Sequence, residues 1–193
     1  MARPREFDEA GALEAAIRCF WIRGYEATSV RDLAQAMGIT GASLYNAYGD
    51  KRALFGRALD HYIQNGFCER SARLEQQLPP REAVLAFFDE IIERSLSDPE
   101  HKGCFIVNAA LEVAPHDPEF KALLAKVQEG MEDFFLRCIR AGQAQGSIDA
   151  AQSADDLARL CLGVLMGLRV LARSRPERAL LEGLVRPLFA LLK

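Results

Sequence analysis

Apolar residues recur three or four positions apart along almost the whole chain, which is the spacing that places them on one face of an α-helix. The first example is Leu13, Ile17 and Phe20, and the last includes Leu180 and Leu184. No alternating run of apolar and polar residues flanks a hairpin dipeptide, so we expect no strands. The 193-residue sequence therefore predicts an all-α protein with about nine helices.

Small hydroxyl and acidic residues mark where the N-terminal helices begin. Thr28 or Ser29 can cap a second helix, and Asp32 lies near the capping-box position. Asp50 can cap a long helix that runs to about Leu74. We therefore expect three short helices followed by one long helix.

Two Asp-Pro-Glu sequences mark helix starts in the second half, because they combine an N-cap, a first-turn proline and an acidic first turn. They predict that segments 97–115 and 116–124 each open a helix. The Gly-Ser pair at 146–147 ends the second of these, and two further helices are expected over 153–172 and 175–192.

The turn "MGIT" between the second and third helices has a specific geometry. Gly38 can adopt the left-handed conformation that ends a helix, Ile39 then packs inward, and Thr40 caps the next helix. Two short helices joined in this way form a helix-turn-helix, whose second helix lies in the DNA major groove. We predict a DNA-binding domain over 1–50 and a regulatory domain over 51–193.

The residue types around this turn suit two kinds of DNA contact. Small and amide side chains at the front of the third helix can approach base edges: Gly41, Ala42, Ser43 and Asn46. Hydroxyl and cationic side chains can contact phosphates: Thr28, Ser29, Thr40, Tyr45 and Lys51. The alternative is that this short helix serves only core packing, which is the role expected of Leu44.

The net charge of −3 is unfavourable for a DNA-binding protein, but the distribution of charge along the chain favours that interpretation. Residues 18–57 hold six basic and three acidic residues, a local excess of three positive charges. That excess lies where the helix-turn-helix is predicted, as a nucleic-acid contact requires.

The segment "GYEATSVRDLAQAMGITGASLYNAYGDKRALF" (24–55) resembles the DNA-binding signature of the tetracycline-repressor (TetR) family of bacterial regulators. The match covers about fifty N-terminal residues and departs from the common "YxxF" pattern only in having Tyr48 as the second aromatic. The resemblance implies an all-helical homodimer with a three-helix DNA-binding unit and a larger unit that holds a ligand pocket. The positions where the family commonly contacts DNA are Thr28, Ser29, Arg31, Thr40, Ser43, Tyr45, Asn46 and Lys51.

The last two helices have broad apolar faces, and Gly163 and Gly167 lie one turn apart on the first of them. Glycines at this spacing let another helix approach closely. The resemblance implies that these helices pair with their copies in a second chain as a four-helix bundle. The alternative is a monomer that folds them inward.

"EHKGCFIVNAALE" (100–112) resembles a subgroup of the family in which Gly-Cys opens a helix, and some of whose members sense electrophiles, oxidants or copper through cysteine. Cys104 would lie near a helix N-terminus and close to His101 and Lys102, which favours a reactive thiolate. The alternative is a buried structural cysteine. His101 and Cys104, with His116 or Glu112 as distant partners, lack metal-site spacing, so no metal is expected.

A non-covalent effector is the other interpretation of the second half. Apolar side chains could line a pocket between helices, with Asn108 as its polar contact. The candidates are Phe87, Phe88, Ile91, Phe105, Asn108, Phe134 and Cys138. The alternative is that all of them are ordinary core.

The remaining composition narrows the class of protein. Five cysteines without a CxxC pair indicate free thiols, and the longest apolar run, 161–168, is too short to span a membrane. The first residues, "MARPREFDEA", lack the apolar core of a signal peptide, so a cytoplasmic location is expected. We expect no cofactor.

An enzyme that uses Cys104 as thiol and His101 as base is the rival function, but no orienting carboxylate, phosphate-binding glycine loop or HExxH motif accompanies them. We therefore expect no enzyme. The predicted function is a dimeric transcriptional regulator, most simply a repressor that a small-molecule or thiol-reactive effector releases from a double-stranded DNA operator.

Overall fold

The computed structural model describes residues 8–193, and every regular element within that range is helical. The helices are α1 (Glu9–Arg23), α2 (Val30–Ala36), α3 (Gly41–Tyr48), α4 (Lys51–Ile63), α5 (Glu69–Gln77), α6 (Pro80–Leu96), α7 (Phe105–Glu112), α8 (Pro118–Ala144), α9 (Ala154–Ser174) and α10 (Arg178–Leu191). A π-helical turn, η1 (Gln64–Cys68), joins α4 to α5. Counted with that turn as one long helix, the described part of the chain holds nine helices, which confirms the predicted class.

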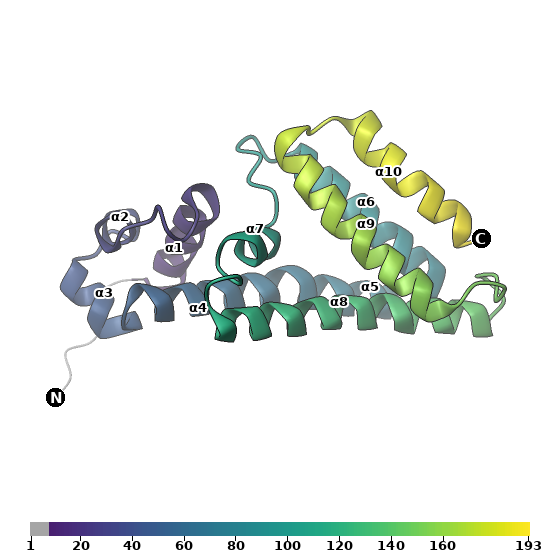
Figure 1. Ribbon diagram of the computed structural model, residues 1–193, viewed down its shortest axis with the longest axis horizontal. Helices are drawn as coiled ribbons and strands as arrows, with labels where there is room; N and C mark the ends of the chain where they lie inside the picture. The colour runs from purple at the N-terminus through teal and green to yellow at the C-terminus, as the bar shows by residue number, and fades with distance from the viewer. Residues whose placement is uncertain (1–7) are drawn as a thin grey trace.

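The helices form an elongated molecule with two distinct ends (Figure 1). Helices α1–α3 lie at one end, and α6, α9 and α10 lie at the other. The long α8 and the α4–α5 helix run along the length between them, while α7 lies near the middle. The N-terminal three-helix unit is thus connected to the larger part mainly through α4 and α7.

The predicted capping residues form the expected contacts in the N-terminal unit. Ser29 caps α2, and a capping box joins its side chain and backbone to Asp32. Gly38 adopts a positive φ of 67° between α2 and α3, Thr40 caps α3, and Asp50 caps α4. Since each of these contacts is local in sequence, short-range pattern was sufficient to predict them.

A continuous hydrophobic core extends from α1 to α10. Aromatic rings fill its centre, and Phe87 of α6 contacts Phe134 and Phe135 of α8 at centroid distances of 5.2 and 5.3 Å. Burial of each such ring contributes about 1.5–3 kcal/mol to folding. The helices of the larger part are therefore held together by side chains from α6, α8 and α9 that pack between them.

The segment before α7 corrects one sequence prediction. Residues 97–104 form a loop, and the helix begins only at Phe105. Positive φ angles at His101 (46°) and Gly103 (74°) interrupt helical geometry. Asp98 does not cap a helix but accepts hydrogen bonds from the backbone N–H groups of Glu100 and Lys102, which hold the loop together.

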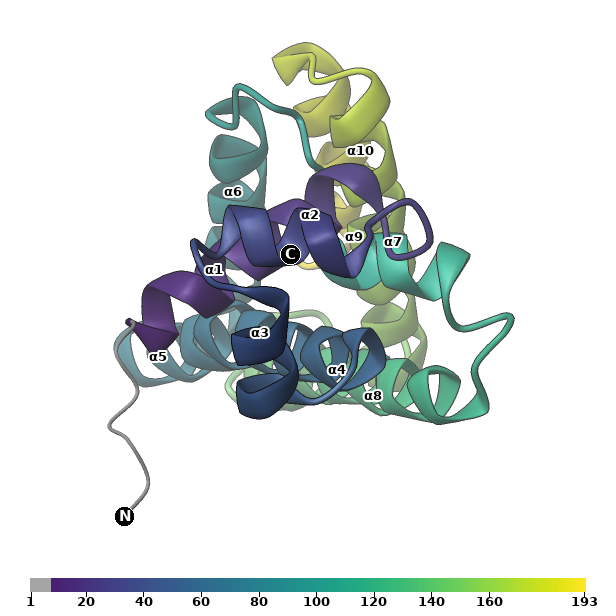
Figure 2. The ribbon, with the colours of Figure 1, turned by 90° about the vertical axis from the view of Figure 1, so that its left-hand side faces the viewer.

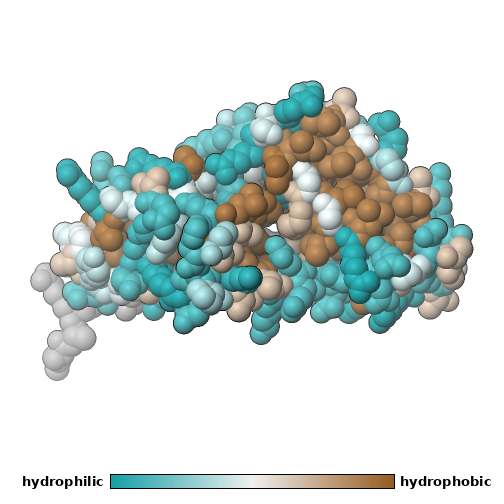
Figure 3. Space-filling view, viewed as in Figure 1, coloured by the Kyte–Doolittle hydropathy of each residue, from teal (hydrophilic) through white to brown (hydrophobic). Residues whose placement is uncertain are grey.

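One surface of the larger part is unusually apolar (Figure 3). Leu160 and Val170 on α9 and Leu191 on α10 are each more than 40% exposed. Gly163 and Gly167 on α9 face open space. Among residues 8–193, no helix has both the length and the apolarity needed to cross a membrane.

Candidate DNA-binding surface and regulatory cavity

Helix α3 is fixed by one face and leaves the other face exposed. Leu44 is fully buried, and the ring of Tyr48 is buried beside it. The Thr40 side chain accepts a hydrogen bond of 3.1 Å from the backbone N–H of Ser43. Figure 2, which looks at the end of the molecule that carries α1–α3, shows α3 in front of the other helices. The helix therefore presents its outer face at the molecular surface.

The outer face carries side chains predicted to contact bases and one, Tyr45, predicted to contact phosphate. Ala42 and Asn46 are exposed, and Tyr45 one turn along is 54% exposed. Ser43 is half-buried, and its hydroxyl oxygen lies 2.9 Å from that of Thr40. Ser43 thus takes part in the cap of its own helix, whereas Asn46 is free to face a groove.

The predicted phosphate contacts Ser29 and Lys51, together with Arg31 from the family's DNA-contact positions, lie on two sides of α3. Ser29 and Arg31 are exposed at the start of α2, and within the described residues Arg31 forms no ion pair. At the start of α4, the Lys51 ammonium lies 4.2 Å from the centre of the Tyr25 ring. This cation–π contact restrains the ammonium near the C-terminal end of α3.

Thr28 does not belong to this surface. It is completely buried, and its hydroxyl donates a hydrogen bond of 2.6 Å to the Gly24 carbonyl. The prediction of a phosphate contact at Thr28 is therefore wrong. Either of the two adjacent hydroxyl residues could have capped α2. Because Ser29 is the cap, the Thr28 side chain points into the three-helix unit.

Glu112 at the end of α7 holds the loop between α1 and α2. Its carboxylate accepts hydrogen bonds from the backbone N–H groups of Tyr25 (3.0 Å) and Glu26 (2.9 Å). Gly24 makes this approach possible, because it has a φ of 85° and a Cβ there would lie 2.7 Å from a carboxylate oxygen. Sequence reasoning treated Glu112 only as a distant metal ligand and missed this contact.

A second connection joins the start of α4 to the start of α8. The Arg52 guanidinium contacts Asp117 at 2.8 Å and Glu119 at 2.6 Å. The hydrogen bond from Arg52 lowers the pKa of Asp117 from its ordinary value. This pair holds α4 against α8. Helix α1 and the loop after it are joined to the larger part by the Arg18–Glu100 ion pair (2.8 Å) and by the Glu112 hydrogen bonds.

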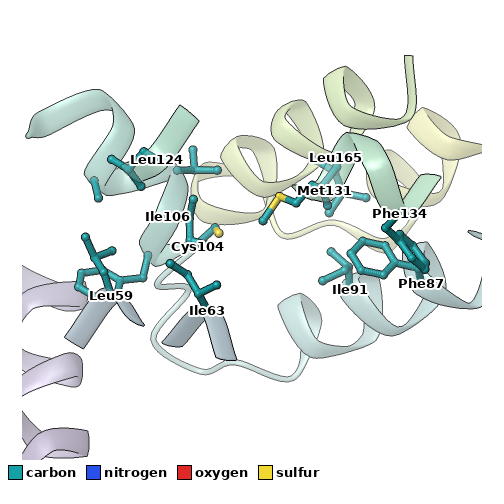
Figure 4. Close-up of a cluster of buried hydrophobic side chains, with 14 of the residues drawn as sticks. Leu59, Ile63, Phe87, Ile91, Cys104, Ile106, Leu124, Met131, Phe134 and Leu165 are labelled. Atoms are coloured by element: carbon teal, nitrogen blue, oxygen red, sulfur yellow. The ribbon is translucent and has the colours of Figure 1, made fainter. Parts of the chain in front are cut away.

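A cavity lies inside the larger part, between η1 and helices α6, α8 and α9. Its apolar lining includes Phe67, Phe87, Ile91, Ile106, Met131 and Leu165. Figure 4 shows Cys104 and Ile106 on one side of this region and Phe87 and Ile91 on the other. Of the predicted lining residues, Phe87 and Ile91 border the cavity, and so does Cys104, which was predicted as a thiol sensor.

The other predicted lining residues are not part of this cavity. Phe88, Phe105, Phe134 and Cys138 are buried in the core and do not line the cavity, although Phe134 packs behind the lining residues Phe67 and Phe87. Asn108 was expected to be the polar contact of the pocket, but its amide donates to the Lys102 carbonyl at 3.2 Å and braces the loop before α7. These parts of the pocket prediction are wrong, because helical spacing identifies buried faces without showing which of them border a space.

The polar groups that do reach the cavity are arginines and a tyrosine. Arg169 of α9 is 6% exposed and donates hydrogen bonds to Ser95 Oγ (3.1 Å), Tyr62 OH (3.2 Å) and the Gly103 carbonyl (3.0 Å). Burial raises the pKa of Tyr62 to about 12, so its hydroxyl is neutral at physiological pH. Arg169 was missed by sequence reasoning, although a charged residue within the apolar run "CLGVLMGLRVLA" was a usable signal.

Cys104 precedes α7 and is buried, with the hydroxyl of Tyr62 3.9 Å from its sulfur and Arg169 beside it. His101, the proposed base of an enzymatic pair, is exposed, whereas Cys104 is buried. Within the described residues, no group of three or more His, Cys, Asp or Glu side chains is arranged to hold a metal ion. The geometry around Cys104 is therefore that of a thiol next to a cation.

Two domain families match the chain. The family described as "Bacterial regulatory proteins, tetR family" matches residues 12–58, and "Tetracyclin repressor-like, C-terminal domain" matches residues 80–186. The first spans the helix-turn-helix and the start of α4, and the second covers α6 to most of α10.

Relatives with related names match most of the chain. The HTH-type transcriptional repressor ComR of Escherichia coli is 31% identical over 185 residues, covering 95% of this chain and 87% of ComR. The uncharacterized HTH-type transcriptional regulator YezE of Bacillus subtilis is 38% identical over 150 residues, covering 77% of each chain.

A solved structure matches over the full length. It is a cysteine mutant of the TetR family transcriptional regulator CifR, complexed with 26-base-pair double-strand operator DNA. The TM-score is 0.88 with 34% sequence identity, and the match covers 100% of both chains.

Proposed function

Since the chain belongs to the TetR family, we propose that it is a DNA-binding transcriptional repressor that leaves its operator when a signal reaches the cavity at Cys104. The observation that carries this proposal is the exposed face of α3, with Tyr45 and Asn46 outward and Leu44 fixed below. CifR, whose structure this chain resembles, is bound to double-strand operator DNA. A repressor of this kind acts on the chromosome, so its place is the cytoplasm.

In this proposal, DNA binding belongs to one end of the molecule, and regulation and dimerisation belong to the rest. Residues 1–50 form the DNA-binding domain, and residues 51–193 form the regulatory and dimerisation domain. Gly41, Ala42, Ser43 and Asn46 approach base edges, while Ser29, Arg31, Thr40, Tyr45 and Lys51 contact phosphates. The regulator needs no catalytic residue in this scheme, since its work is binding and release.

The apolar surface of α9 and α10 supports a homodimer. Leu160, Gly163 and Gly167 lie three or four residues apart, and Val170 continues the same stripe. An exposed apolar stripe of this length is costly in water, and the two glycines facing open space leave room for a second helix. A second copy of the chain would cover the stripe and form the four-helix bundle.

Helix α7 is the proposed route from the cavity to the DNA-binding unit. Cys104, at its start, lines the cavity, and Glu112, at its end, holds the backbone between α1 and α2. An effector that displaces the start of α7 therefore moves the loop that leads into α2 and α3. The effector must bind more tightly to the state that cannot hold DNA, because release requires differential affinity.

Two effector classes fit this site. A thiol-reactive molecule would modify Cys104, and a small molecule would occupy the cavity beside it. Both act at the same place, so the Cys104→Ser variant separates them: release by mild oxidant disappears in this variant, whereas release by a non-covalent ligand remains.

The proposal is tested by operator binding with DNA from upstream of the protein's own gene. Fluorescence anisotropy should give weaker binding for Tyr45→Ala and Lys51→Ala on every sequence, because phosphate contacts carry no sequence information. Asn46→Ala should instead lose about 1–3 kcal/mol of discrimination between operator and altered bases.

Lys126→Ala is the matched control, because this exposed lysine lies on α8 in the larger part. Its operator affinity should equal that of the wild type. Equal losses for Lys51→Ala and Lys126→Ala, or identical base preference in Asn46→Ala and wild type, would contradict the assignment of α3.

A further inference from the structure

Arg169 is a buried cation that lies beside the Cys104 thiol and, within the described residues, pairs with no carboxylate. Its three hydrogen bonds end on the Ser95 hydroxyl, the Tyr62 hydroxyl and the Gly103 carbonyl, all of them neutral groups. Among the residues that the structure describes, no carboxylate lies within ion-pair distance of it. A buried charge is normally paired, since removing it from water costs free energy that an opposite charge returns.

Two more arginines border the same cavity and add to its positive charge. Arg70 and Arg94 line it together with Arg169. Burial, followed by the charge of Arg94, lowers the pKa of Arg70 from its ordinary value. The nearby carboxylate of Glu90 is 3.2 Å from Arg70 and is shared with Arg73 at 2.7 Å. One shared carboxylate does not neutralise this group of cations.

The rest of the cavity wall is apolar. Its backbone departs from regular α-helix at the π-helical turn η1. Side chains of α6, α8 and α9 provide apolar contacts opposite Cys104 (Figure 4). The π-helical turn η1 brings Gly66 and Phe67 to the wall. Such turns inside long helices are frequent at functional sites, because they displace side chains from the regular helical register. The cavity measures about 40 Å³. A cavity that binds benzene measures about 150 Å³, so an organic ligand enters here only if the wall moves.

We propose that the effector held in this cavity is a small organic acid, whose carboxylate pairs with Arg169 and whose short acyl or aryl body packs against the apolar wall. This inference rests on the proposed function and names the ligand class of the same site. Planar guanidinium groups suit carboxylates because they can donate two parallel hydrogen bonds.

The same arginine offers a direct link to release. Arg169 holds the Gly103 carbonyl, which immediately precedes Cys104 and the start of α7. A carboxylate that takes up these donors competes with that carbonyl and frees the loop before α7. The other end of α7 carries Glu112, so the change is transmitted to the backbone of Tyr25 and Glu26.

The test uses benzoate and butyrate as probes and benzamide as the uncharged counterpart of benzoate, at neutral pH. Calorimetric titration of the full chain should show binding of an acid and no binding of the amide. Saturating acid should weaken operator affinity by about 5- to 150-fold, the usual range of coupling between two sites.

Arg169→Gln should raise the Kd for the acid by about 10- to 150-fold, as expected for the loss of a charge-assisted hydrogen bond. Arg94→Gln should act in the same direction and by less, and it serves as the deciding variant if Arg169→Gln does not fold, because Arg94 is exposed. Arg159→Gln is the matched control on α9, since that exposed arginine pairs with Glu132 away from the cavity. Its acid affinity should equal that of the wild type.

Different results would overturn the organic-acid ligand and the proposed repressor function. Equal binding of benzoate and benzamide, no binding of either acid, or unchanged acid affinity in the folded arginine variants would overturn the inference. A thiol reagent that releases DNA from the wild type but not from Cys104→Ser, in a protein that binds no acid, would likewise overturn it. Arg169 would then serve the Cys104 thiol. A protein that binds acid but no operator would contradict the proposed function alone.

Discussion

At the scale of single residues, the contacts that matter most join groups far apart in sequence. Ser29, Gly38 and Thr40 could be predicted because each acts on its immediate neighbours. Glu112 and Arg169 could not be assigned, since their partners lie 66 to 107 residues away or on other helices. Helical periodicity indicates which residues are buried, but it does not show which distant backbone group a carboxylate or guanidinium will reach.

Replacing Glu112 by glutamine tests the contact between α7 and the DNA-binding unit. The amide lacks the negative charge and presents an N–H group, so two backbone donors lose a charged acceptor. We expect a loss of about 1.5–3 kcal/mol in the free energy of unfolding, measured by urea denaturation. Glu129→Gln, on the exposed face of α8, should change it by less than about 0.5 kcal/mol. Equal losses in both variants would show that the Glu112 contact does not stabilise the fold.

Tyr62 makes stability depend on alkaline pH. Burial raises its pKa from 10.0 to about 12, so folding disfavours the ionised phenol. The stabilising contribution is complete below pH 10, the unfolded value, and is lost as pH rises through the folded value near 12. Burial also raises the pKa of Cys138 and Cys161 to about 12, so wild type and Tyr62→Phe must be compared.

The difference in unfolding free energy between wild type and Tyr62→Phe should shift against the wild type between pH 10 and 12. Urea denaturation across this range measures it. A difference that stays constant with pH would contradict the raised pKa, because a mere loss of the hydroxyl contact produces a constant offset.

At the scale of elements, the sequence predicted helix existence better than helix starts. Asp117 caps α8 as expected, because Pro118 and Glu119 follow in a chain that continues as a helix. The matching Asp-Pro-Glu sequence at 98–100 forms a loop, since Gly103 at positive φ interrupts it before the apolar stretch begins. The cavity was predicted only in part for a similar reason: its arginines and the π-helical turn depend on how helices meet.

The exposed stripe on α9 yields a prediction for assembly. Val170→Glu places a charge where two copies would meet, so the dimer should dissociate toward the 21.4 kDa monomer. Sedimentation equilibrium measures this change. Leu78→Glu is the matched control, because Leu78 is 37% exposed at the end of α5, outside the stripe. A monomeric wild type, or equal dissociation of both variants, would contradict an interface on α9 and α10.

At the scale of the whole molecule, the positions of the two ends explain how binding and sensing are separated. The face of α3 proposed to contact DNA lies at one end, the apolar surface lies over α9 and α10, and the cavity with α7 lies between them (Figures 1 and 3). In a dimer, two copies of α3 would need centres about 34 to 36 Å apart to enter successive major grooves. In the proposed mechanism, a displacement at α7 changes this spacing and so disturbs both half-sites together.

The most direct test of the central claim is the affinity of the wild-type protein for double-stranded DNA from upstream of its own gene, compared with a scrambled fragment of the same length and composition. We predict binding at least about 1,000-fold tighter to the natural fragment, falling steeply as salt rises. Equal affinity for both fragments, with selected genomic DNA also showing no preferred sequence, would contradict the assignment of this protein as an operator-binding repressor.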